Sequence, residues 1–330
     1  MEWILIVTLL CIFLYLHITS LKNNTKYLKR TALFLYKKGK YSKALKFIKK
    51  HKNSFTENFY YSLLIEILIE SKKIEESLIA CDEALKCKCT DSVLYNNISW
   101  AYFESGMLKE AIVHAEKSIE LDQNFAAPYA NKGNCYYILG DLKESVHCFK
   151  KALELKKELP AALYGAGLCL YKLNKYEESE SHLVKYLKHN KKSINTYKML
   201  ADIYYNREDY DSSILMYETI ISFNPTIPWS YYELGNVLFL KGDLDRAIRE
   251  LDKAIELDDN SAIPYYYKCR IYAVFRNIDE SFQCLEKAIL REKYLRLIAL
   301  DDNFLNNLKV YSKFKDIVGS RKEDIIGELE

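Results

Sequence analysis

An alanine or serine recurs at an almost constant interval along most of this chain. The eight positions are separated once by 33 residues and then six times by 34: Ala44, Ser77, Ala111, Ser145, Ser179, Ser213, Ala247 and Ser281. Twelve residues before each of them lies a second position that holds mostly small residues: Ala32, Ile65, Ser99, Gly133, Gly167, Ala201, Gly235 and Cys269. This period restricts the chain to a repeat architecture, in which one copy cannot bury its apolar face alone and therefore stacks on its neighbours.

Each copy has the pattern of two helices joined by a short turn. Seven residues after the earlier small position, five copies carry a residue suited to the left-handed backbone conformation that ends a helix: Gly39, Gly106, Gly140, Asn174 and Gly242. All five prolines lie at the junctions between copies, where they interrupt no helix interior: Pro128, Pro160, Pro225, Pro228 and Pro264. We therefore predict two antiparallel helices per copy, with the two small positions facing each other so that the backbones approach closely.

The composition agrees with an all-helical chain. Only 10 Gly and 5 Pro among 330 residues are too few for a many-stranded sandwich or barrel, because those folds need many turns. With 49% hydrophobic residues the chain is too apolar to be disordered, and its net charge of +3 makes no strong electrostatic case for nucleic acid.

The copy from Ala127 to Leu155 reads APYANKGNCYYILGDLKESVHCFKKALEL. It resembles the tetratricopeptide repeat family at that family's signature positions: Tyr129, Gly133, Tyr136, Gly140, Ser145, Phe149 and Ala152. The resemblance implies an all-α, right-handed superhelical solenoid of about eight helix-turn-helix repeats over residues 23–293. The copies lie near 25–57, 58–91, 92–125, 126–159, 160–193, 194–227, 228–261 and 262–293, and the first is the most divergent. The dense apolar residues that follow predict one or two capping helices within 294–330, with a frayed charged tail after Val318.

The N-terminal segment, residues 1–22, is expected to be a transmembrane anchor. Trp3 to Leu21 contains no Asp, Glu, Lys or Arg, and a helix of this length spans about 28 Å, close to the hydrocarbon thickness of a bilayer. A cleaved signal peptide is the rival interpretation, but no basic residue precedes the apolar run and Ile18 and Ser20 make a poor cleavage site. A lipoprotein signal at Cys11 is disfavoured by the bulky Leu9 and Leu10.

Charge and cysteine content predict where the repeats lie. Four basic residues follow the apolar run and none precedes it, so the repeats should be cytoplasmic on a single-pass cell-membrane protein: Lys22, Lys26, Lys29 and Arg30. The nine cysteines form no Cys-x-x-Cys pair, and their odd number points to free thiols in a reducing compartment.

No pattern predicts catalysis, a metal site or a cofactor. There is no Gly-rich phosphate loop, nucleophile elbow or His-Glu-x-x-His motif. His114, His147 and His182 are spaced by 33 and 35 residues, so they could align along second helices, but solvated histidines are the simpler interpretation. We therefore expect a protein that is not an enzyme, with no small-molecule substrate.

The family resemblance places a partner-binding groove on the inner, concave face formed by the first helices. The positions exposed there are rich in Asn and aromatic residues: Asn96, Asn97, Trp100, Asn131, Asn134, Tyr137, Tyr164, Tyr171, Asn195, Tyr205, Trp229, Tyr232, Asn236, Tyr267 and Arg270. An Asn amide both donates and accepts hydrogen bonds, so it can pair with a peptide backbone of any sequence, and aromatic side chains are frequent at binding hot spots. Some of these aromatics could instead only pack against the next copy.

A carboxylate clamp of the kind that grips chaperone C-termini is not supported. Asp202, Glu233 and Tyr267 stand where Asn, Asn and Arg would be needed. The expected function is a scaffold that binds a peptide or protein at the cytoplasmic membrane face. The alternatives are an exported protein that serves envelope assembly or secretion, and a subunit that alters a partner enzyme's rate.

Overall fold

The computed structural model describes residues 24–87 and 90–319, whose regular secondary structure is helical, with no β-strand among them. They divide into two compact units between Tyr186 and Leu187. In the first unit, residues 24–37 are helical and are followed by α2 (Tyr41–Lys50), η1 (Lys52–Ser54), α3 (Glu57–Glu70), α4 (Ile74–Lys86), α5 (Ser92–Glu104), α6 (Leu108–Leu121), α7 (Ala126–Leu139), α8 (Leu142–Leu155), α9 (Pro160–Lys172) and α10 (Tyr176–Leu187). The all-α prediction is confirmed for the described residues.

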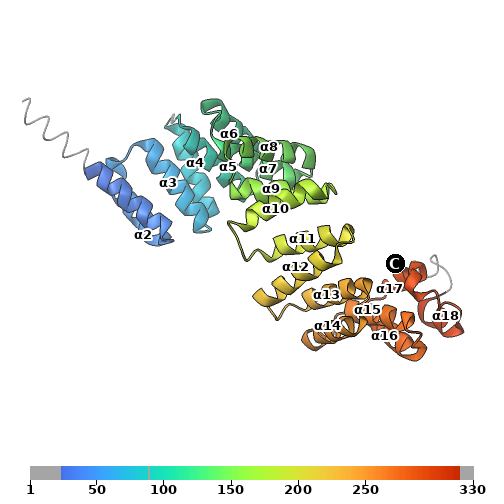
Figure 1. The fold of residues 1–330 in the computed structure, drawn as a ribbon. Helices are drawn as coiled ribbons and strands as arrows, with labels where there is room; N and C mark the ends of the chain where they lie inside the picture. Colours follow the sequence, from blue (N-terminus) through green and yellow to red (C-terminus); the bar gives the residue numbers. More distant parts are fainter. Residues whose placement is uncertain (1–23, 88–89, 320–330) are drawn as a thin grey trace, which may run out of the picture. The chain divides into compact units, whose positions relative to one another are not determined.

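The second unit continues the same pattern and ends in shorter helices. It contains α11 (Ile194–Asn206), α12 (Tyr210–Phe223), α13 (Pro228–Lys241), α14 (Leu244–Leu257), α15 (Ile263–Val274), α16 (Ile278–Arg291), α17 (Leu295–Asp301), η2 (Asn303–Leu305) and α18 (Ser312–Val318). Within each unit, successive helices pack as pairs that stack side by side, as expected for a solenoid of helix-turn-helix repeats (Figure 1).

The two small positions of a copy face each other across its helix pair, as predicted. The hydroxyls of Ser145, Ser179 and Ser213 donate to the backbone oxygens of Gly133, Gly167 and Ala201, at 2.8, 2.7 and 3.0 Å. All three serines are fully buried. The recurring interval therefore marks the place where the two helices of each copy lie closest.

A residue with positive φ ends the first helix of all eight copies. Four are glycines, as predicted: Gly39, Gly106, Gly140 and Gly242. The other four are Lys72, Asn174, Glu208 and Arg276, whose φ values lie between 56° and 61°. The turn geometry is therefore the same in every copy, even where the residue is a poor match for a left-handed conformation.

A single aromatic side chain joins three helices in the first unit. Phe149 of α8 is fully buried, and its ring lies between Gly133 of α7 and Gly165 of α9. A Cβ added to Gly133 would lie 2.9 Å from this ring, and one added to Gly165 would lie 2.3 Å from it. Both glycines are thus needed because the ring occupies the space of their missing side chains.

The end of the second unit is covered by its last helices. Leu295 and Ala299 of α17, Leu305 of η2 and Phe314 of α18 share a buried apolar cluster with residues of α15 and α16. This segment buries the open face that a terminal repeat would otherwise expose.

No helix in the described part of the chain is long and apolar enough to cross a membrane. The anchor predicted for residues 1–22 lies outside the described residues, as does the tail after Gly319.

Candidate functional site

The asparagines predicted to line the groove of the first unit bind to one another across three first helices. The amide nitrogen of Asn97 (α5) donates to the backbone oxygen of Ser62 (α3) at 3.0 Å. Asn96 donates to the Asn97 side-chain oxygen at 3.2 Å, and Asn131 (α7) donates to the Asn96 side-chain oxygen at 3.0 Å. Asn96 and Asn97 are buried, whereas Asn131 is half-buried and its Oδ1 accepts no hydrogen bond within the described residues. The network therefore ties the helices together and leaves Asn131 as its accessible end.

The other predicted residues of this unit are half-buried: Trp100, Asn134, Tyr137, Tyr164 and Tyr171. The Trp100 indole nitrogen donates to Glu104 at 3.2 Å. The Tyr164 ring lies 5.0 Å from that of Tyr186, and the Lys172 ammonium lies 5.2 Å from the centre of the Tyr137 ring. These aromatics thus pack partly within the unit and keep one part open to a ligand.

In the second unit, charged groups accompany the predicted aromatics on α11 and α13. The Lys198 ammonium lies 3.4 Å from an Asp202 carboxylate oxygen and 5.9 Å from the centre of the Trp229 ring. The Tyr217 hydroxyl (α12) donates to the other Asp202 oxygen at 3.0 Å. Asn195, at the start of α11, is exposed, and the Tyr205 ring packs 6.3 Å from that of Tyr210.

Glu233 (α13) is a half-buried acid beside these groups. Burial, together with the nearby Asp202 carboxylate, raises the pKa of Glu233 to about 7, although Lys198 partly opposes the shift. Within the described residues, its carboxylate makes no hydrogen bond or ion pair. The neighbouring Tyr232 and Tyr267 rings pack edge to face at 6.3 Å.

Arg270 (α15) joins this face to the C-terminal cap. Its guanidinium donates to the side-chain oxygen of the buried Asn236 at 3.1 Å, and its Nε lies 3.3 Å from Asp302 Oδ2. The guanidinium also lies 4.3 Å from the centre of the Phe304 ring. Asp302 accepts further hydrogen bonds from the Tyr266 hydroxyl at 2.8 Å and the Phe304 backbone N–H at 2.9 Å. The C-terminal cap therefore brings the Asp302 carboxylate into an ion pair with the predicted site residue Arg270.

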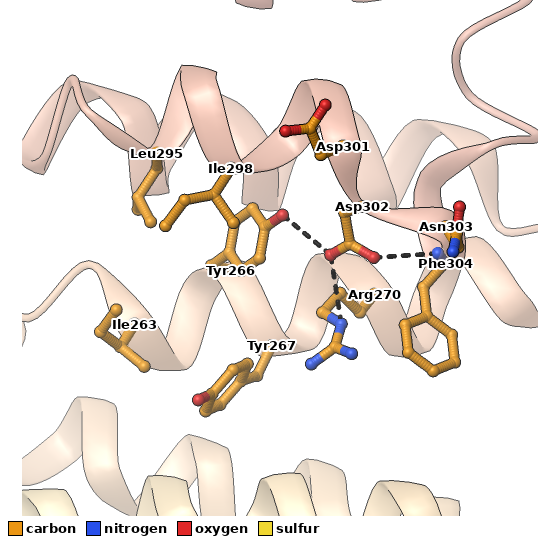
Figure 2. Close-up of a pocket in the computed structure, with 10 residues that line it drawn as sticks. All are labelled: Ile263, Tyr266, Tyr267, Arg270, Leu295, Ile298, Asp301, Asp302, Asn303 and Phe304. Carbon is orange, nitrogen blue, oxygen red and sulfur yellow. Dashed lines mark hydrogen bonds and ion pairs between the residues drawn. The ribbon is translucent and has the colours of Figure 1, made fainter.

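A cavity of about 620 Å³ lies between α15 and the α17–η2 segment. Figure 2 shows the apolar side chains of Leu295 and Ile298 on α17 together with Ile263 and Tyr266 on α15. The polar residues Arg270, Asp301, Asp302 and Asn303 lie towards one end of the cavity. An apolar wall with a few polar groups is the usual construction of a site for a side chain or small ligand.

Part of this site was not predicted from the sequence. Asp302 and Phe304 lie in the capping segment, which was expected only to cover the last repeat. Their signal was present in the DDNF sequence at 301–304, where acids precede an aromatic just after a short apolar helix. Among the described residues, no group of three or more His, Cys, Asp or Glu side chains could hold a metal ion.

Three family models match parts of the chain. Tetratricopeptide repeat models match residues 194–227 and 228–261. Residues 104–186 match a model described as anaphase-promoting complex, cyclosome, subunit 3. The two repeat models and the fold support the prediction of a tetratricopeptide-repeat protein. A search of curated proteins finds no match.

Several solved structures are similar to this chain. YrrB, described as a TPR protein with an unusual peptide-binding site, is 23% identical, with a TM-score of 0.51, and the match covers 60% of this chain and 98% of that one. A MamA fragment from Desulfovibrio magneticus is 24% identical, covering 51% and 95%, with a TM-score of 0.47. PilF of Pseudomonas aeruginosa is 17% identical, covering 68% and 95%, with a TM-score of 0.48.

Proposed function

We propose that this chain is a non-enzymatic scaffold that binds a peptide segment of a partner protein on the face formed by its first helices. The observation that carries the proposal is the cavity between α15 and the α17–η2 segment, which has an apolar wall and polar groups at one end. Such a cavity fits one anchoring side chain of a bound peptide. The peptide-binding site described for YrrB, a protein of this fold, supports the same class of function.

The aromatic residues on α13 and α15 extend the binding face beyond the cavity. Trp229, Tyr232 and Tyr267 are half-buried, so each combines a fixed position with accessible ring surface. Asp202 and Glu233 lie among them and favour a peptide that carries a basic residue at this point. In the first unit, the accessible oxygen of Asn131 offers an acceptor for a peptide N–H.

Photo-crosslinking in intact cells tests the binding face. A photoreactive amino acid at the exposed Asn303 should crosslink to the partner, and Ile298→Asp should abolish the crosslinked band because it places a charge on the apolar wall. Leu290→Asp is the matched control, since Leu290 is 82% exposed on α16 and lies outside the cavity. Equal crosslinked bands with both variants would argue against this site.

The membrane tether and the cytoplasmic location are part of the same proposal. They are supported by the uncharged sequence from Trp3 to Leu21, by the basic residues that follow it, and by the free thiols. The seven cysteines in the described residues are all free. In intact cells, an impermeant thiol reagent should fail to label a cysteine introduced at the exposed Ser181, and it should label this cysteine after lysis. Labelling before lysis would instead favour the exported protein.

A further inference from the structure

The first repeat has a charge unlike that of the rest of the chain. Residues 24–56 contain ten Lys and one Arg and no Asp or Glu, whereas residues 57–330 contain 36 Lys and Arg and 44 Asp and Glu. All but Lys29 of the eleven cations are exposed. None of them forms an ion pair within the described residues. The positive charge of this repeat is therefore turned to solvent and not neutralised by the fold.

The first helix of this repeat also exposes apolar side chains. On the helix over 24–37, Tyr27 is 67% exposed and Phe34 is 56% exposed, while Leu28 and Ala32 on the opposite face are buried. The spacing of three or four residues puts Tyr27, Arg30 and Phe34 on one stripe of this helix. The remaining members of the stripe are Lys26, Leu33 and Lys37. An exposed stripe that mixes cations with two aromatic residues and a leucine is typical of helices that lie in a membrane interface.

We propose that this surface of the first repeat, the helix over 24–37 with α2, binds the surface of a bilayer that contains acidic phospholipids. The lysines and Arg30 would bind the phosphate and carboxylate groups of the lipids, and Tyr27, Leu33 and Phe34 would enter the headgroup region. The apolar side chains favour a bilayer over a nucleic acid backbone, because phosphates alone give them no apolar contact. The assignment depends on residues 24–52 only and needs neither the anchor nor the peptide site.

Binding of the full chain to vesicles tests the proposal. The apolar run from Trp3 to Leu21 can partition into any bilayer, so the measured quantity is the ratio of two partition coefficients. The first is measured on vesicles of phosphatidylcholine with about one-third phosphatidylserine, and the second on phosphatidylcholine alone. We expect the acidic vesicles to be preferred at least tenfold at low salt, and the preference to fall as salt is raised.

Charge reversal of exposed lysines in the first repeat should remove this preference. The variant carries Lys37→Glu, Lys38→Glu, Lys43→Glu and Lys46→Glu, and a second variant carries Gln at the same positions in case the reversal disturbs folding. The matched control reverses four exposed lysines in later repeats: Lys143, Lys157, Lys188 and Lys191. We expect the ratio of partition coefficients to be at least tenfold lower for the first-repeat variant than for the wild type. The control should change this ratio less than twofold.

Leu33→Ser with Phe34→Ser tests the apolar part of the surface and should lower the ratio at least threefold with the charge unchanged. Equal ratios for the wild type and the first-repeat variants would overturn the proposal. Binding of labelled RNA or DNA duplexes tighter than vesicle binding at the same salt, and lost in the same variants, would overturn it in favour of a nucleic acid.

Discussion

One backbone position in each copy adopts the same left-handed conformation whatever residue occupies it. At Gly140 and Gly242, φ is 84° and 91°, and an added Cβ would meet no atom within 4 Å. Glu208 and Arg276 hold φ near 60° with a full side chain. A residue other than Gly costs about 1 kcal/mol in this region, so four copies retain a local strain that the rest of the repeat stabilises.

Replacing these residues by glycine should stabilise the protein. We expect Glu208→Gly and Arg276→Gly each to raise the free energy of unfolding of the second unit by up to about 1 kcal/mol. Urea unfolding followed by circular dichroism measures the change. The reverse substitution, Gly242→Arg in the same unit, should lower the stability by a similar amount. A loss of stability in Glu208→Gly and Arg276→Gly would show that these side chains contribute more than the strain removes.

The stability of the second unit should depend on pH through Glu233. The folded pKa of Glu233 is raised to about 7 from an ordinary 4.5, so folding favours the protonated acid. Between these two values the folded state binds more protons than the unfolded state, and stability therefore decreases as the pH rises through about 7. Glu233→Gln should be more stable than the wild type by about 1–2 kcal/mol at pH 8 and equal to it near pH 4.

Thermal unfolding at the two pH values measures this difference. Glu292→Gln is the control, because Glu292 is exposed and its side chain makes no ion pair or hydrogen bond within the described residues. If Glu233→Gln is no more stable than the wild type at pH 8, the carboxylate is better solvated than its surroundings indicate.

At the scale of the helices, the α7–α8–α9 junction depends on Phe149. Its ring fills the space left by Gly133 and Gly165, and neither glycine has a side chain that could close a cavity there. We expect Phe149→Ala to cost about 3–5 kcal/mol of stability in the first unit. Urea unfolding measures the loss, with His147→Ala on the exposed side of α8 as the control. A loss of stability below about 1 kcal/mol would mean that α7 and α9 move towards each other and close the cavity.

The helices could be predicted from the sequence more fully than their surfaces. The Ala and Ser interval predicted the facing sites correctly, because only small residues allow two helices to lie this close. The role of Asn96 and Asn97 could not be predicted, since an amide at an inner position points to solvent or to the next helix according to the distance between copies. Asp302 was missed for a related reason, because it caps η2 and reaches Arg270 only through the packing of η2 on α15.

At the scale of the whole molecule, each unit has apolar clusters of its own. Those of the first unit include Ile65 and Phe149, and those of the second include Leu251 and Leu285. Between α10 and α11, residues 188–192 are exposed and include Lys188, Lys191 and Lys192. Because each unit buries its own core, cleavage of the chain in this segment should leave two folded fragments.

Limited trypsin digestion tests this expectation. We expect the first cut within the described residues to fall after one of these three lysines and to yield two fragments that resist further digestion. A variant with Gln at all three positions should lose this cut and retain the others. Early cuts inside α3–α9 or α12–α16, or rapid loss of either fragment, would contradict independent cores.

The close contact of Phe149 with Gly165 limits how the copies could be rearranged by protein engineering. At the register position of Gly165, other copies carry Leu63, Asn97, Asn131, Met199, Glu233 or Tyr267. A designed chimera that places any of these first helices directly after α8 would bring a side chain into the ring of Phe149. Phe149 and Gly165 can therefore be exchanged only as a matched pair. Any rearrangement of the copies must keep α8 and α9 together.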